Sequence, residues 1–321
     1  MSNILITGAC GYLGSMLCYT LSKKYNILGI DNLLFNQGHL IHRAMKDVEF
    51  YNMDVDGIPD NLLENVETVI PLACLTGAPI VSKNPTMGTR VNKDSILRLI
   101  DRLNPNVRVI IASTNSGYGS QIGTCTEESP LNSVSLYGKL KEELEASVLQ
   151  KCKNVVVFRL ATVYGLSFRA RLDLLINCLV YDAYFNQEIT IFDDSFMRNY
   201  VNIQDIIRGI DFSLDNFSKM NNNIYNIGDD SINMSKMDLA KTITKQIPVP
   251  IRTVQMTDPD ARNYIVSSAK LYKLGFKPQY NLDYGINELI NYYSFLPKDP
   301  TERENITKYM RNDKFIAEHD N

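Results

Sequence analysis

The fold is decided by residues 4–14, which read Ile4-Leu5-Ile6-Thr7-Gly8-Ala9-Cys10-Gly11-Tyr12-Leu13-Gly14. The first four residues are typical of a buried strand, and a helical apolar pattern runs from Tyr12 to Lys24. Between them, the spacing G-x-x-G-x-x-G places glycines where the backbone turns tightly and where a pyrophosphate could approach the positive end of a helix. A glycine triplet alone is weak evidence, because tight strand-to-helix turns also collect glycine for steric reasons.

Outward from this segment, short β-branched runs alternate with helical segments, which is typical of a parallel sheet with helices on both faces. We predict six strands, at residues 4–7, 26–31, 48–51, 68–72, 107–112 and 154–160. The fold class is therefore α/β, a doubly wound parallel sheet of Rossmann type with a smaller C-terminal α/β region. That region follows Gly165 and is expected to contain a helix from Leu172 to Phe185, a strand at 188–191 and a terminal helix within 298–321.

The amino-acid composition and charge of the chain argue against several classes of function. The 321 residues carry 33 Lys and Arg against 36 Asp and Glu, a net charge of −3, with no basic block that would attract nucleic acid or a membrane surface. No apolar run reaches the ~18 residues of a membrane span, so we expect a cytoplasmic protein with small-molecule partners. We expect no metal, because neither the six cysteines nor the three histidines have zinc-ligand spacing: Cys10, Cys18, Cys74, Cys125, Cys152, Cys178, His39, His42 and His319.

Two carboxylates follow predicted strands on the nucleotide side. Asp31 ends the second strand, where it can accept hydrogen bonds from the ribose hydroxyls of adenosine and would repel a 2′-phosphate. This position favours NAD over NADP as the cofactor. Asp54, just past the third strand, is placed to meet the adenine edge. The alternative for Asp31 is a solvated turn carboxylate, which the strand and glycine loop before it make less attractive.

A tyrosine and a lysine stand four residues apart on one helical face, at Tyr137 and Lys141. An unperturbed phenol titrates near ~10, so a tyrosine base needs a neighbouring positive charge, which Lys141 can supply. Hydroxyl groups at 113–116 follow the fifth strand and face the same sheet edge. The alternatives are an exposed helix that carries a tyrosine and some lysines, and a Ser/Thr-rich turn that satisfies its own backbone.

In these residues the chain resembles the extended short-chain dehydrogenase/reductases, specifically the NAD-dependent epimerase/dehydratase family that acts on sugar nucleotides. The resemblance spans most of the chain. It rests on Gly8, Gly11 and Gly14, on Asp31-Asn32-Leu33, on Leu72-Ala73-Cys74, on Asn92, on Tyr137 with Lys141, and on residues 159–165, 197–205, 225–228, 260–264, 270 and 274–278.

The resemblance implies roles for individual residues. Thr114 would hydrogen-bond the substrate hydroxyl, Tyr137 would remove its proton, and Lys141 would hold the nicotinamide ribose, while a hydride passes from sugar C4 to NAD. Arg198 and Arg262 would clamp the diphosphate of the nucleotide sugar, and Thr76 and Asn115 would also bind substrate. The implied NAD contacts are Gly8, Gly11, Tyr12, Leu13, Gly14, Asp31, Asn32, Asn36, Asp54, Val55, Leu72, Ala73, Cys74, Asn92, Tyr137, Lys141 and Val163.

The outcome after oxidation stays open. Asn115 and Ser116 stand where related dehydratases and decarboxylases carry carboxylates, which disfavours elimination and decarboxylation. Cys125 and Cys178 are acid/base candidates for C3 or C5 epimerisation by residue type, and we expect both to be structural. The remaining reactions are those of a 4-dehydrogenase, a 4-epimerase or a 4-ketoreductase, and a non-catalytic NAD-binding sensor or scaffold is a further alternative.

The resemblance also suggests organisation and context. We expect a NAD-binding domain at 1–165, with 200–225 returning to it, and a sugar-nucleotide-binding region at 166–199 and 226–321. Residues 75–83 and 166–172 would line the sugar pocket, and helices at 91–103 and 137–150 would pair two subunits in a homodimer. The Asn-, Lys- and Ile-rich composition hints at a bacterial capsule or lipopolysaccharide pathway, with which the GDP-heptose 4-dehydrogenase branch is compatible.

Overall fold

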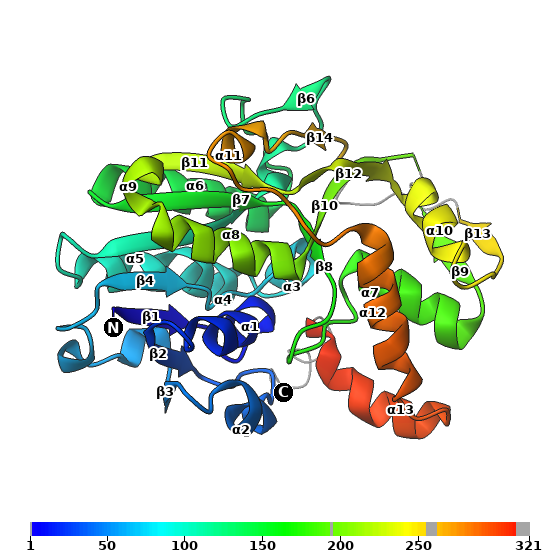
Figure 1. The fold of residues 1–321 in the computed structure, drawn as a ribbon, viewed down its shortest axis with the longest axis horizontal. Coiled ribbons are helices and arrows are strands. Elements are labelled where there is room, and N and C mark those ends of the chain that lie inside the picture. Colours follow the sequence, from blue (N-terminus) through cyan, green and yellow to red (C-terminus); the bar gives the residue numbers. More distant parts are fainter. Residues whose placement is uncertain (1, 193–194, 255–261, 313–321) are drawn as a thin grey trace.

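The computed structural model describes residues 2–192, 195–254 and 262–312 (Figure 1). Seven parallel strands form its central sheet, which confirms the predicted doubly wound architecture. From edge to edge the strands are β11 (Asn223–Ile227), β7 (Val155–Leu160), β5 (Arg108–Thr114), β4 (Thr68–Pro71), β1 (Asn3–Thr7), β2 (Asn26–Asp31) and β3 (Glu49–Asn52). The strand order reverses between β1 and β4, and in such sheets ligands bind at this switch point.

Burial explains why these segments are strands. Every residue of β4 and of β7 is buried, and four of the five residues of β1 are, as expected for strands covered by helices on both faces. The edge strand β3 is exposed or half-buried throughout. The predictions of strands at 4–7, 68–72 and 154–160 are therefore confirmed, to within two residues at each end.

Helices cover both faces of the sheet (Figure 1). On one face, α1 and α8 contact each other and share a core with the central strands. On the other face, α5 and α6 pack against β5 and β7, with Leu144 and Val148 buried as the helical spacing predicted. The bounds are α1 (Tyr12–Leu21), α2 (Ile41–Ala44), α3 (Ala78–Lys83), α4 (Pro85–Thr89), α5 (Ser95–Asp101), α6 (Leu136–Lys151), α8 (Ile203–Asp215) and α9 (Phe217–Met220).

The sheet differs from the prediction in one strand. We expected six strands, and β11 adds a seventh, parallel to β7. Its sequence, NIYNI, lacks a continuous apolar run because Asn226 is buried inside the strand. That amide accepts a hydrogen bond from the Tyr118 hydroxyl at 2.7 Å and donates one to the Ser267 carbonyl oxygen at 3.0 Å. Hydrogen-bond partners that are distant in the sequence cannot be predicted from the local sequence pattern.

The C-terminal elements pack beside the carboxyl edge of the sheet and share a separate apolar core (Figure 1). The expected helix at 172–185 is shorter, α7 (Leu175–Tyr181), and continues as a π-helical turn at 182–186. The charged C-terminal segment contains α13 (Pro300–Thr307), and residues 313–321 of it lie outside the described residues. The other elements are β6 (Thr124–Cys125), β8 (Thr162–Tyr164), β9 (Ile189–Ile191), β10 (Met197–Asn202), β12 (Asp229–Ser235), α10 (Lys236–Thr244), β13 (Ile251–Thr253), β14 (Ile265–Val266), α11 (Ala269–Tyr272) and α12 (Leu282–Ser294).

In the part of the chain that the structure describes, no helix combines the length and the apolar character needed to cross a membrane.

Candidate active site

A cavity of about 330 Å³ opens at the switch point, over the carboxyl ends of the central strands. Its wall is formed by the glycine loop, the ends of β2, β4 and β5, the first turn of α6, and the segment after β8. This volume lies in the usual range for small-molecule sites, ~300–1,000 Å³. The position and size make this cavity the candidate active site.

The glycine loop lines the floor of the cavity because side chains are excluded there. Gly8 has φ of +69°, and a Cβ at this position would lie 2.7 Å from the Ala73 backbone nitrogen. The Gly11 amide donates to the Gly8 carbonyl oxygen at 2.9 Å, which closes the turn before α1. A Cβ on Gly14 would collide with the same carbonyl oxygen. The loop can thus bring backbone close to a ligand at the positive end of α1.

Asp31 ties the end of β2 to this loop. Its carboxylate accepts hydrogen bonds from the Cys10 amide at 2.9 Å and from the Leu33 amide at 2.7 Å. Burial raises the pKa of Asp31, while the two amides and the nearby Arg169 oppose the rise. The side chain is 7% exposed and lines the cavity, and its carboxylate has acceptor capacity beyond these two bonds. Asp54 lines the same end of the cavity.

Three predicted catalytic residues, Thr114, Tyr137 and Lys141, line one cavity. Lys141 donates from Nζ to the Ala112 carbonyl oxygen at 3.0 Å, which fixes its ammonium beside the end of β5. The Thr114 hydroxyl donates to Ser116 Oγ at 2.9 Å and accepts from the Ser116 amide at 3.1 Å. Thr114 therefore both caps a local turn, as the alternative interpretation held, and faces the cavity.

The electrostatics of Tyr137 differ from the sequence argument. Burial raises the pKa of the Tyr137 phenol well above its usual value, and the neighbouring Cys74 adds to the rise. The positive charges that oppose this are Arg171 and Arg262, both of which line the cavity. We expected Lys141 to supply the stabilising charge, whereas the charges that lower the pKa of the phenol here are those of the two arginines.

Most of the predicted site residues meet in this cavity. Those that line it are Gly8, Gly11, Tyr12, Leu13, Gly14, Asp31, Asn32, Asp54, Val55, Leu72, Ala73, Cys74, Thr76, Thr114, Tyr137, Lys141, Val163 and Arg262. Four predicted residues are not part of the lining: Asn36, Asn92, Asn115 and Arg198. Asp260 and Ala261, from the motif before Arg262, lie outside the described residues.

Asn92 supports the site from behind. It is fully buried in a π-helical turn, accepts from the Leu75 amide at 2.8 Å, and donates to the Leu75 carbonyl oxygen at 2.9 Å. Both ends of its amide are thereby committed to the backbone between Cys74 and Thr76, which lines the cavity. Asn92 thus holds a lining segment in place, and its direct contact with NAD stays a prediction.

The other three residues lie elsewhere. Asn36 is exposed in a loop with a positive φ of 57°. Asn115 is 1% exposed, and among the described residues neither polar atom of its side-chain amide has a hydrogen-bond partner. Arg198 is buried with its guanidinium 5.3 Å from the centre of the Tyr264 ring. The two cysteines expected to be structural, Cys125 and Cys178, are also absent from the lining.

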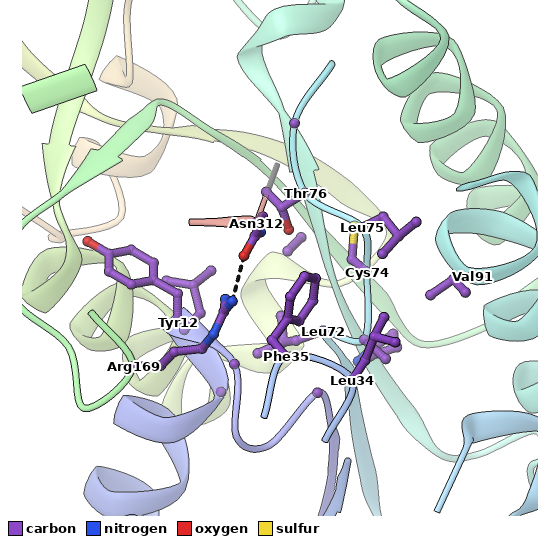
Figure 2. A pocket seen from close by; sticks show the side chains of 18 of the residues that line it. Tyr12, Leu34, Phe35, Leu72, Cys74, Leu75, Thr76, Val91, Arg169 and Asn312 are labelled. Carbon is purple, nitrogen blue, oxygen red and sulfur yellow. Dashed lines mark hydrogen bonds between the residues drawn. The ribbon is translucent and has the colours of Figure 1, made fainter. Parts of the chain in front are cut away.

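Residues that the sequence argument did not assign complete the wall. Figure 2 shows the hydrogen bond from Arg169 to Asn312, with the Phe35 ring beside the arginine. Arg171 also lines the cavity, and it forms a hydrogen-bonded ion pair with Asp173, with the Nη2 to Oδ2 distance 2.5 Å. The signal was present in the segment expected to line the sugar pocket, where two arginines alternate in Phe168-Arg169-Ala170-Arg171. Asn312 had no such signal, because it comes from a distant part of the chain.

Fold and cavity together define a dinucleotide-binding α/β protein of the doubly wound class. The family model "NAD dependent epimerase/dehydratase family" matches residues 4–228, and the chain therefore belongs to this family of NAD-dependent, sugar-nucleotide-modifying enzymes. The glycine cradle and Asp31 fit NAD, since a Cβ would fill the cradle and the carboxylate faces the cavity.

Individual relatives are similar over most of their length. A Bacillus subtilis protein described as an uncharacterized UDP-glucose epimerase, YtcB, is 30% identical over 226 residues, covering 64% of this chain and 71% of the relative. The UDP-glucose 4-epimerase of Lactobacillus helveticus is 26% identical, over 87% of this chain and 93% of the relative. The crystal structure of UDP-glucuronic acid 4-epimerase from Bacillus cereus superposes with a TM-score of 0.81 at 23% identity, covering 91% of this chain and 99% of that one.

Proposed function

We propose that this protein oxidises C4 of a nucleotide-activated sugar with NAD, and that it acts as a 4-epimerase or a 4-dehydrogenase. The observation that carries the proposal is the convergence of Thr114, Tyr137 and Lys141 in the cavity that also contains the glycine loop and Asp31. These are a hydroxyl, a phenol and an ammonium beside a dinucleotide site. They supply the groups needed to bind a sugar hydroxyl and remove its proton.

Each residue has a separate task in this proposal. Thr114 accepts or donates a hydrogen bond to the O4 hydroxyl, and Tyr137 takes the O4 proton. Lys141, fixed by its bond to the Ala112 carbonyl oxygen, holds the nicotinamide ribose. NAD, when bound, would supply the acceptor for the C4 hydride. Because burial raises the pKa of Tyr137, removal of the proton depends on nearby positive charge, which Arg171 and Arg262 provide on the protein side.

The charges in the cavity argue against elimination of water. Among the described residues, the carboxylates in the lining are Asp31 and Asp54, and both belong to the adenosine end. The residues after Thr114 are the amide Asn115 and the hydroxyl Ser116, so this loop supplies no carboxylic acid to the proposed sugar position. A 4-keto sugar formed here would be either released or reduced again at C4.

Relatives support action at C4, since two that we compared are described as 4-epimerases. We place the 4-epimerase and the 4-dehydrogenase before the 4-ketoreductase, because Asp31 favours NAD, which suits oxidation or recycling. The proposed setting is a bacterial cytoplasmic pathway to capsule or lipopolysaccharide sugars, with the protein as a homodimer paired through α5 and α6. A non-catalytic NAD sensor remains the second candidate, and the test below separates it.

The test uses the purified protein with NAD and a panel of UDP-, GDP- and dTDP-linked sugars, followed by product masses and NADH absorbance. Loss of two hydrogens with stoichiometric NADH identifies a 4-dehydrogenase, and an isomeric product of unchanged mass identifies an epimerase. Tyr137→Phe should abolish either activity, whereas the exposed Tyr284→Phe serves as the matched control. A Tyr137→Phe variant as active as the parent would overturn the catalytic assignment, and loss of water would overturn the argument from Asn115 and Ser116.

A further inference from the structure

The cavity contains more positive than negative charge. In the part of the lining that the structure describes, four side chains are cationic, Lys141, Arg169, Arg171 and Arg262, against the two carboxylates of Asp31 and Asp54. Arg171 already has a carboxylate partner in Asp173. A site that receives dianionic diphosphates is expected to have such an excess. Each of these cations can therefore be assigned either to NAD or to the sugar nucleotide.

Arg169 stands out because it is buried and, among the described residues, forms no ion pair with a carboxylate. It is 7% exposed, and its guanidinium lies 4.4 Å from the centre of the Phe35 ring. Nη2 donates to Asn312 Oδ1 at 2.5 Å, and Nε has no hydrogen-bond partner among the described residues. Burial and the neighbouring Arg171 lower its pKa to about 10, so it stays cationic near neutral pH. A buried cation left in this state is costly unless an anion completes it.

The segment that carries Arg169 is fastened to the start of α1. The Tyr12 hydroxyl donates to the Gly165 carbonyl oxygen at 2.9 Å, and Ser167 Oγ donates to the Tyr12 carbonyl oxygen at 2.7 Å. Arg169 follows two residues later, so its guanidinium is held beside the glycine loop and close enough to Asp31 to act on that carboxylate. Figure 2 shows the side chain rising from the Tyr12 side of the cavity.

A second segment holds Arg169 from the other side. Leu172 donates its amide to the Met310 carbonyl oxygen at 2.8 Å, and the Asn312 amide lies 3.4 Å from Asp173 Oδ2. With the bond from Arg169 to Asn312, these contacts lay residues 310–312 along residues 169–173. We define residues 310–312 as the C-terminal strap. Asn312 is 2% exposed and lines the cavity, so the strap forms part of the cofactor wall.

We propose that Arg169 binds the diphosphate of the dinucleotide opposite the glycine loop, and that Asn312 of the C-terminal strap positions it, so that the strap controls how tightly NAD is retained. A planar guanidinium with a free Nε suits phosphate oxygens. The anion is assigned to the diphosphate rather than to a 2′-phosphate, because the Asp31 carboxylate faces the ribose side and would repel the latter. The proposal depends on NAD binding and is independent of the reaction at C4.

The test is calorimetric titration of cofactor-free protein with NAD, ADP-ribose and adenosine. For Arg169→Gln we expect the Kd for NAD and ADP-ribose to rise about 10- to 100-fold, the range for losing a charge-assisted hydrogen bond, with adenosine unaffected. Arg252→Gln, an exposed arginine in β13, is the matched control and should leave all three unchanged. The NAD content of the protein as purified should fall in parallel.

Two further readouts separate this role from others. If Arg169 serves the ligand, Arg169→Gln should leave the thermal midpoint of the cofactor-free protein unchanged or higher, because an under-compensated buried charge is removed. A lowered midpoint with unaltered NAD affinity would show a purely structural role and overturn the proposal. Equal weakening of adenosine binding would also overturn the proposal. So would weaker binding of UDP to the NAD-loaded protein with unchanged NAD affinity, because UDP binding reports on the site for the diphosphate of the sugar nucleotide.

The strap is tested through Asn312→Ala, with the exposed Asn291→Ala in α12 as control. Loss of a neutral positioning bond should raise the Kd for NAD about 2- to 10-fold and speed NAD release, measured by displacement with excess ADP-ribose. In the Arg169→Gln background, Asn312→Ala should add little, because both act on one contact. Full additivity of the two changes would contradict the proposed positioning role.

Discussion

The ion pair of Arg159 with Glu145 offers the sharpest prediction about stability. Both side chains are almost fully buried, 5% and 6% exposed, and Arg159 also donates to the Tyr118 hydroxyl at 3.0 Å and to the Glu127 carbonyl oxygen at 3.1 Å. Removing one partner of such a pair leaves a buried charge uncompensated, which typically costs about 3–5 kcal/mol. We therefore expect Glu145→Ala to lower the free energy of unfolding by this amount.

The assay is urea-induced unfolding followed by circular dichroism. The control is Glu143→Ala on the same helix α6. Its ion pair with Lys93 is also short, 2.7 Å, but the glutamate side chain is 56% exposed. An exposed pair contributes at most about 1 kcal/mol. In the double variant Glu145→Leu with Arg159→Met, much of the lost stability should return, since an apolar pair needs no compensation. Equal losses for the two glutamate variants would refute the reasoning.

The remaining predictions concern the site. Asn92→Ala should weaken NAD binding about 10-fold although Asn92 does not line the cavity, because the Leu75 backbone loses two hydrogen bonds; calorimetry tests this, and unchanged affinity would contradict it. Arg171→Gln combined with Asp173→Asn removes the ion pair without leaving a buried charge, and it takes away a cation that lowers the pKa of Tyr137. Since the base acts when deprotonated, the rising limb of kcat/KM should move to higher pH, and an unmoved profile would argue against this charge.

The nucleotide half of the site could be predicted from sequence because its signals are local. Gly8 and Gly14 stand in one short segment between a strand and a helix, and backbone sterics allow little other than glycine there. Asp31 ends an apolar strand, so its place at the sheet edge followed from topology. Structure can be predicted reliably from sequence where, as here, the residues are contiguous and one physical constraint dominates.

The rest depended on contacts between distant segments. Asn92 belongs to the expected helix, but its partner Leu75 lies 17 residues away, and only the fold shows that it supports the wall. The contact of Arg169 with Asn312 spans 143 residues and forms because the C-terminal strap folds back along the cavity. Strand β11 was missed for the same reason, since its buried Asn226 is satisfied by partners from elsewhere in the chain.

The central claim is that the hydride leaves C4 of the sugar. The most direct measurement is turnover of the sugar nucleotide found in the panel, deuterated at C4, with the mass of the reduced cofactor read during a single turnover. The account predicts that deuterium moves from C4 to NAD and that the rate shows a primary isotope effect, both lost in Tyr137→Phe. Reduced cofactor without deuterium, formed while product accumulates, would show oxidation at another carbon and contradict the account.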